Sequence, residues 1–112
     1  MYLKFRFYNY NTSEYESAIS GWHYHVDINE MFEYLMEENY SIEQLVYIQD
    51  DEEFYIFDVV EASSLNTFIG VIEWDFESKK VVIRSLKTGK CFDFIPNRKL
   101  KKLGTKHDYV NN

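Results

Sequence analysis

The chain has 112 residues, with 12 Lys and Arg side chains against 19 Asp and Glu, which gives a formal net charge of −7. A chain of this length folds around one core that buries roughly 65% of its unfolded surface, which excludes large catalytic barrels and two-domain dehydrogenases. No segment approaches the roughly 20 consecutive apolar residues of a membrane span, and the start, MYLKFRFYNY, lacks a signal-peptide pattern. We therefore expect a soluble, cytoplasmic protein.

The charge is divided unevenly along the chain. Residues 1–78 hold two basic and 17 acidic side chains, a net charge of −15, whereas residues 79–112 hold ten basic and two acidic ones, a net charge of +8. Between Arg6 and Lys79 lie 72 residues without a single Lys or Arg. An acidic surface also improves solubility, but mixed charge would serve that purpose too. The long run of one sign therefore favours a use for its electric field.

The N-terminal segment alternates apolar and polar residues over positions 3–8, which predicts a half-buried strand. Over residues 11–20 the pattern weakens, and a short helical stretch is expected there. Residues 22–26 are expected to be extended.

The clearest local signal is a helix that begins after Asp27 and runs to about Asn39. Asp27 is the expected N-cap, with Glu30 as its capping-box partner. The apolar positions form one stripe expected to be buried: Ile28, Met31, Phe32, Leu35 and Met36. The opposite face is an acidic ridge: Glu30, Glu33, Tyr34, Glu37 and Glu38.

The rest of the chain reads as strands. Leu45–Gln49 and Phe54–Val60 predict a hairpin whose tip carries four consecutive carboxylates: Asp50, Asp51, Glu52 and Glu53. Three further strands are expected at Thr67–Phe76, Lys80–Leu86 and Cys91–Ile95. Because their connections are short, neighbouring strands should be antiparallel.

These elements predict an α+β fold, an antiparallel sheet of about five strands packed on one principal amphipathic helix at about residues 28–39. Residues 1–96 are expected to form a single domain. Residues 97–112 form a basic C-terminal tail, expected to be partly disordered or a short docking helix.

The best candidate for a metal site is His23, His25 and Asp27, an H-x-H-x-D pattern similar to the one in metallo-β-lactamase-like hydrolases. The resemblance stops at Ile28, where that family has a further histidine, and its fold needs about twice this length. We therefore expect structural or surface histidines, and no cofactor or metal.

Other catalytic patterns are weak. Cys91 lies in an expected strand, and the four glycines do not share a loop. Paired carboxylates have no distinctive spacing. The sequence therefore favours a protein that is not an enzyme.

Six tyrosines fall among polar and acidic positions and are expected to add contact area at an interface: Tyr8, Tyr10, Tyr15, Tyr34, Tyr40 and Tyr47. On an expected helix, Glu30 and Glu33 lie about 4.5 Å apart along the axis and Glu33 and Glu37 about 6 Å apart, which approaches the spacing of phosphates along a DNA strand. In size, charge and composition the chain resembles small acidic, aromatic-rich inhibitors encoded by phages and mobile elements, among them DNA mimics, anti-restriction proteins and anti-CRISPR proteins.

The sequence therefore predicts a non-enzymatic inhibitor that presents an acidic, tyrosine-bearing surface to the basic nucleic-acid-binding groove of a partner such as a nuclease. The expected contacts are the helix ridge and the hairpin tip named above. An immunity protein that neutralises a basic nuclease toxin is the first alternative, and it would need the same surface.

Two further alternatives use the positive segment. A nucleic-acid-binding module would use the basic C-terminal hairpin and tail. A head-to-tail homo-oligomer would place the positive segment of one copy on the negative segment of another.

Overall fold

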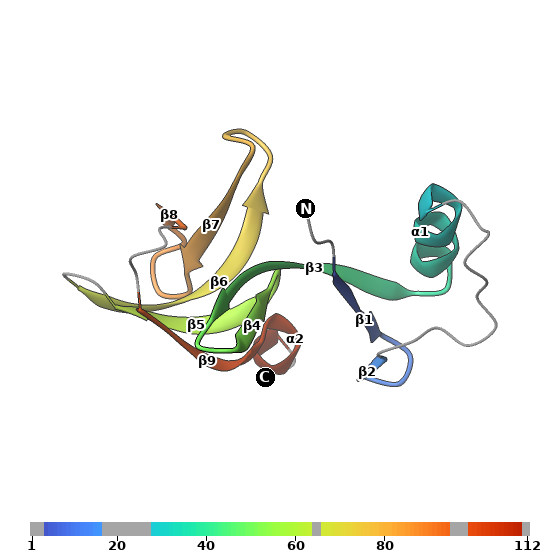
Figure 1. The fold of residues 1–112 in the computed structure, drawn as a ribbon, viewed down its shortest axis with the longest axis horizontal. Helices are drawn as coiled ribbons and strands as arrows, with labels where there is room; N and C mark the ends of the chain where they lie inside the picture. The colour runs from blue at the N-terminus through green and yellow to red at the C-terminus, as the bar shows by residue number, and fades with distance from the viewer. Residues whose placement is uncertain (1–3, 17–27, 64–65, 95–98, 111–112) are drawn as a thin grey trace. The chain divides into compact units, whose positions relative to one another are not determined.

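The computed structural model describes residues 4–16, 28–63, 66–94 and 99–110, which are mostly in β-strands (Figure 1). The elements follow in chain order: β1 (Phe5–Asn9), β2 (Glu14–Glu16), α1 (Ile28–Glu37), β3 (Tyr40–Gln49), β4 (Glu52–Tyr55), β5 (Asp58–Ser63), β6 (Thr67–Asp75), β7 (Lys80–Ser85), β8 (Cys91–Asp93), β9 (Lys99–Thr105) and α2 (Lys106–Val110). No helix among these described residues is long and apolar enough to cross a membrane.

The predicted α+β fold with one principal helix is wrong. The strands form two antiparallel sheets, in the orders β2-β1-β3-β4 and β8-β7-β6-β5-β9. The predicted helix is present as α1, but it has only ten residues, and α2 has five. Strand β2 has only three residues, and β9 breaks the apolar alternation by which strands are recognised, so the strand content was underestimated.

The chain divides into two compact units, Met1–Leu45 and Val46–Asn112, which we describe separately. In the first unit, β1 pairs with β2 and with the beginning of β3. A turn over residues 10–13 joins β1 to β2, so the helical stretch expected at residues 11–20 is absent from residues 11–16. The extended stretch expected at residues 22–26 and the proposed cap Asp27 lie outside the described residues.

Helix α1 ends where Asn39 adopts a left-handed conformation, with φ 69°. The amide of Asn39 donates to the carbonyl of Met36 at 3.2 Å, which closes the last turn before β3 begins at Tyr40. Leu35 is fully buried as predicted, but Met36 is 69% exposed. Successive helical residues are rotated by about 100°, so Met36 lies at the edge of the apolar stripe rather than within it.

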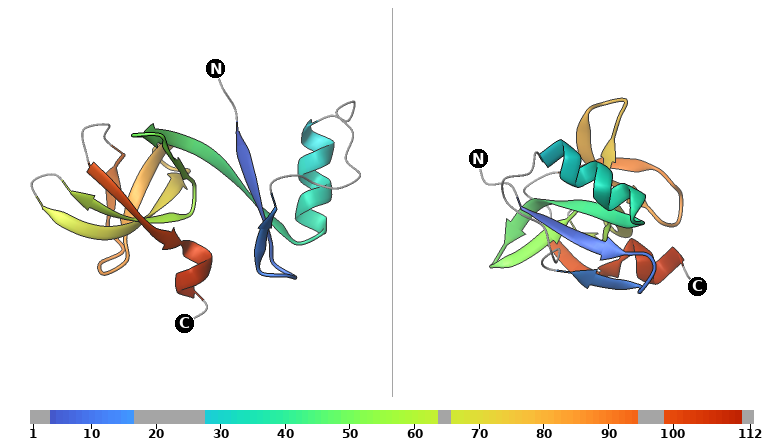
Figure 2. Two further views of the ribbon diagram at one scale, coloured as in Figure 1. Left: turned by 60° about the horizontal axis from the view of Figure 1, so that its bottom comes forward. Right: turned by 90° about the vertical axis from the view of Figure 1, so that its right-hand side faces the viewer.

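The core of the second unit lies between the β3–β4 hairpin and one face of the five-stranded sheet. Its buried members come from five strands: Phe54, Val60, Ala62, Ile72, Ile83 and Leu100. Figure 2 shows β5 between β6 and β9 in this sheet. Gly70 is required where β6 passes β7, since a Cβ there would lie 2.6 Å from the Ile83 side chain and 2.7 Å from the Arg84 carbonyl oxygen.

Two features of the second unit differ from the expected strands. The run predicted at 54–60 is broken by a turn at residues 56–57, where Phe57 has φ 76° and the Asp58 carboxylate accepts the Tyr55 amide at 2.8 Å. Residues 99–105, expected to be disordered or helical, form strand β9 beside β5.

The edge strand β9 is tied to the β3–β4 hairpin by a side-chain amide. The Gln49 amide donates to the Leu100 carbonyl at 3.0 Å and accepts from the Leu100 amide at 3.3 Å. Lys102 Nζ donates to the backbone carbonyl of Glu53. The hairpin that carries the predicted acidic tip is therefore held against β9.

Candidate protein-binding surfaces

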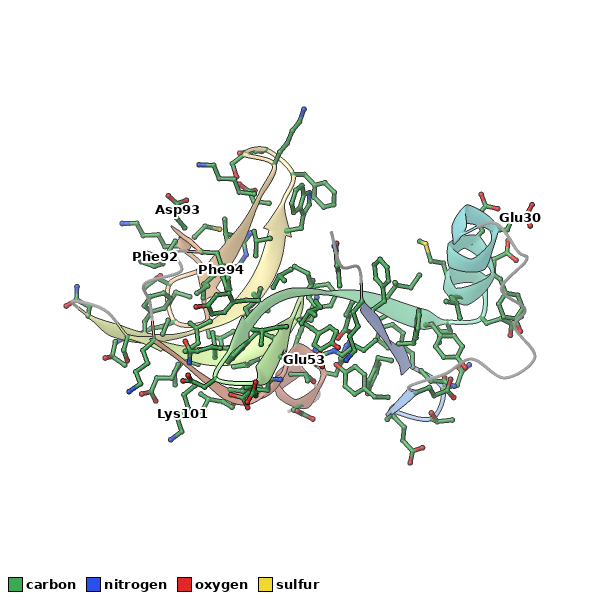
Figure 3. All side chains as sticks on the ribbon, viewed as in Figure 1. Glu30, Glu53, Phe92, Asp93, Phe94 and Lys101 are labelled. Atoms are coloured by element: carbon green, nitrogen blue, oxygen red, sulfur yellow. The ribbon has the colours of Figure 1, made fainter. Side chains whose placement is uncertain are left out.

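The predicted helix ridge is exposed on α1 and on the turn that follows it, where Glu38 lies. Its four carboxylates are exposed, and the Tyr34 side chain is 44% exposed. Figure 3 labels Glu30 at one end of the ridge. In the part of the chain that the structure describes, none of these carboxylates forms an ion pair with a Lys or Arg. Like charges three or four residues apart repel by about 0.2 to 0.5 kcal/mol per pair, and the helix dipole disfavours those near the C-terminus.

The predicted hairpin tip is also exposed. Asp50, Asp51 and Glu52 are exposed and Glu53 is half-buried. All four line one open hollow of about 730 Å³, together with Ile48, Tyr55 and Lys102. The Tyr55 hydroxyl donates to Glu53 Oε1 at 3.1 Å. The turn therefore gathers four consecutive carboxylates around a shared concave surface, with one lysine at its side.

The tip has an unfavourable backbone for its sequence. Asp50 has φ 50° and Asp51 has φ 69°, the two left-handed residues of a tight hairpin turn. Asn-Gly and Asp-Gly are the usual pairs in such turns, because a side chain at these φ values costs roughly 1 kcal/mol or more. The second aspartate thus adds charge where a glycine would be more stable.

The ridge lies in the first unit and the tip in the second, so each is treated as a surface of its own. The structure brings together the four tip residues, and α1 brings together the ridge residues.

Several other carboxylates of the acidic run have structural roles. Glu43 is fully buried and accepts from Arg6 Nε at 2.7 Å, the Tyr15 hydroxyl at 2.9 Å and the Ser41 hydroxyl at 2.9 Å. Asp58, also fully buried, lies 3.5 Å from Lys102 Nζ. The net charge of the acidic run therefore overstates its exposed negative charge.

Ion pairs and hydrogen bonds shift the pKa of three other groups. The Arg84 guanidinium lies 2.8 Å from Glu73, which raises the pKa of Arg84. The Ser78 hydroxyl donates to Asp75 at 2.6 Å and lowers the pKa of that carboxyl. The hydrogen bond from Tyr40 to Glu16 raises the pKa of the phenol.

The predicted interface tyrosines divide into three kinds. Tyr10, Tyr15 and Tyr34 are 47%, 38% and 44% exposed. Tyr8 is buried, and its ring contacts Tyr10 and Tyr15 edge to face at 5.3 and 5.0 Å. Tyr40 and Tyr47 are half-buried.

The proposed metal ligands His23, His25 and Asp27 lie outside the described residues. Among the residues that are described, no group of three His, Cys, Asp or Glu side chains could hold a metal ion. Cys91 is exposed on strand β8.

Sequence reasoning did not identify Lys102 and Gln49, which position the hairpin tip. A lysine within the basic segment and a glutamine at a strand end carry no local signal of these contacts, because the partners are 49 and 51 residues away in sequence. The chain matches no protein-family model, and no curated protein matches it in sequence.

Proposed function

We propose that this chain is a non-enzymatic protein-binding module that inhibits a basic, nucleic-acid-binding partner by occupying its groove with carboxylates. The observation that carries the proposal is a difference between two groups of acidic side chains, one paired with cations of this chain and the other exposed. Cations of this chain pair with Glu43, Asp58 and Glu73. The ridge carboxylates and three of the four tip carboxylates are exposed and, within the described residues, have no such ion pair.

Exposed carboxylates at repelling distances and on a left-handed turn lower the stability of the protein. A surface that reduces stability is expected to persist where it contributes to binding. A partner groove lined with Lys and Arg, built to hold phosphates, would relieve this repulsion. The partner proposed is therefore a nuclease or another nucleic-acid-binding protein. If the partner is a defence enzyme, the chain is an anti-defence inhibitor. If the partner is a toxin, the chain is an immunity protein.

The test begins with capture of partners from host cells on immobilised protein, followed by elution with increasing salt. The purified partner is then titrated against three variants that each remove two charges. The ridge variant carries Glu33→Gln and Glu37→Gln, and the tip variant carries Asp50→Asn and Asp51→Gly. The matched control carries Glu14→Gln and Glu77→Gln, two exposed carboxylates that lie outside both surfaces.

We expect the ridge or the tip variant to weaken binding by about tenfold or more, because each removes two close charge contacts. The tip variant should also be more stable to urea, since glycine accepts the positive φ at position 51. The control should bind like the wild type. Equal binding by all three variants would refute the proposal, and equal weakening by all three would indicate attraction by net charge alone.

A further inference from the structure

An apolar hollow in the second unit is a separate surface, distinct from the acidic tip. It has a volume of about 730 Å³ and lies where β6 begins and β7 ends. Its apolar lining comes from β6, the turn after β7, β8 and α2: Phe68, Ile69, Leu86, Phe92 and Tyr109. The rings of Phe68 and Phe92 lie 4.6 Å apart, and the Leu86 amide donates to the Ile69 carbonyl at 3.0 Å. The walls of the hollow are thus fixed by contacts of their own.

Three of the lining side chains are large, apolar and accessible. Ile69 is 43% exposed, Leu86 is 48% exposed and Tyr109 is 42% exposed. Isolated exposed apolar residues need no explanation, but a concave group of them is typical of a binding surface.

Two lysines lie at this hollow. Lys87 lines it, and Lys90 Nζ lies 5.8 Å from the centre of the Phe92 ring. Glu61 is the one carboxylate in the lining described, and Lys101 is its cross-strand neighbour on β9. Figure 3 labels Phe92 and Lys101 on these strands. A complementary ligand would insert an apolar or aromatic group and surround it with carboxylates.

Helix α1 carries such a group. Tyr34 is 44% exposed. Glu30 precedes it by four residues, and Glu37 and Glu38 follow it by three and four residues. These positions are its neighbours on a helical surface. The described structure records no ion pair for the three carboxylates. The same chain therefore contains an aromatic side chain ringed by negative charge and an apolar hollow with a basic rim.

We propose that α1 of one molecule docks in the apolar hollow of a second copy, with Tyr34 inserted and its glutamates facing Lys87 and Lys90. Such contacts use two different surfaces, so they join molecules head to tail, into rings or open chains. The unit that carries α1 holds two basic and eight acidic side chains in residues 1–45, a net charge of −6, which would favour contact with the two lysines. Self-association would cover the ridge.

The test is the molar mass of the purified full chain, measured by sedimentation velocity over a concentration series at low and high salt. We expect the mass to rise with concentration at low salt and to return to that of the monomer at high salt. Tyr34→Ala and Lys87→Glu should each weaken association by about tenfold or more. Circular dichroism of each variant verifies that it is folded.

Lys80→Glu is the matched control, because Lys80 is an exposed lysine at the opposite end of β7 and the charge change is the same. It should associate about as strongly as the wild type and far more strongly than Lys87→Glu. The double variant Glu37→Lys with Lys87→Glu exchanges the charges and should recover association.

A wild-type protein that stays monomeric at every concentration would overturn the proposal. Equal losses for Lys80→Glu and Lys87→Glu would overturn the assignment to the hollow, and failure of the exchanged pair to recover would overturn the assignment to α1. If the protein stays monomeric and binds a foreign acidic peptide through Lys87, the hollow is a binding site for another protein and the proposal is wrong. Because Lys87 is outside the ridge and the tip, the Lys87→Glu variant tests self-association separately from the proposed function, whereas Tyr34→Ala and Glu37→Lys change the ridge as well.

Discussion

At the scale of single residues, burial and partners decide what a carboxylate does. Glu43 and Glu33 have the same side chain, but Glu43 is fully buried with three donors while Glu33 is exposed on α1. Removing one member of a buried, hydrogen-bonded ion pair leaves the other charge without compensation.

Glu43→Ala should therefore lower the free energy of unfolding of the first unit by about 3 kcal/mol or more, because it leaves the Arg6 guanidinium and the hydroxyls of Tyr15 and Ser41 without their acceptor. Urea unfolding followed by circular dichroism measures the loss. Glu33→Gln is the control and should change stability by less than about 0.5 kcal/mol. A stable Glu43→Ala variant would show that the buried network does not support the sheet.

The Asp75 carboxylate gives a prediction about pH. Two hydrogen bonds from Ser78, through its hydroxyl and its amide, favour the ionised carboxylate and lower the pKa of Asp75. A lowered pKa in the folded state means that this contact stabilises the fold above the unfolded-state pKa, and that the stabilisation is lost as the pH falls through the folded-state pKa. Ser78→Ala should raise the Asp75 pKa, as measured by NMR titration. An unchanged pKa would contradict the assigned cause.

At the scale of elements, strands rich in β-branched and aromatic residues were predictable and irregular ones were not. β6 and β7 are two such runs on either side of a turn, and both appear where the sequence predicts them. β9 has the sequence KLKKLGT, whose two leucines have helical spacing, and its pairing with β5 decides its structure. The turn at Phe57 was missed because aromatic residues rarely adopt positive φ.

The candidate surfaces were predictable to the same extent. Helical spacing places the ridge glutamates on α1, and the two flanking β-rich runs place Asp50 and Asp51 at a turn. Sequence patterns did not distinguish those exposed carboxylates from Glu43 and Asp58, because burial in a sheet depends on strands that are distant in sequence.

The bond between Gln49 and Leu100 gives a prediction for the edge of the five-stranded sheet. The Gln49 amide satisfies both backbone groups of Leu100 on β9, and an edge strand with unpaired groups promotes association with other strands. Gln49→Ala should lower stability by about 1 to 3 kcal/mol, since it leaves two half-buried polar groups without their partner. It should also increase salt-resistant aggregation, measured by light scattering. Gln44→Ala, at an exposed glutamine of β3, is the control and should change neither property.

At the scale of the whole molecule, the charge distribution predicts how binding depends on salt. Residues 7–78 contain no Lys or Arg, so a basic partner would be attracted over distances comparable to the Debye length, about 10 Å at 0.1 M salt. Attraction at this range accelerates encounter more than it slows dissociation.

As the salt concentration is raised, the association rate constant with the captured partner should therefore fall about two- to threefold for each doubling, and tenfold or more over the whole series. The dissociation rate constant should change little. The ridge variant with Glu33→Gln and Glu37→Gln should associate more slowly at low salt and show a shallower salt dependence, because it contributes two fewer charges to the field. Surface plasmon resonance measures both constants. If salt and the ridge variant act mainly on dissociation, the carboxylates make short-range contacts and long-range attraction has no part in recognition.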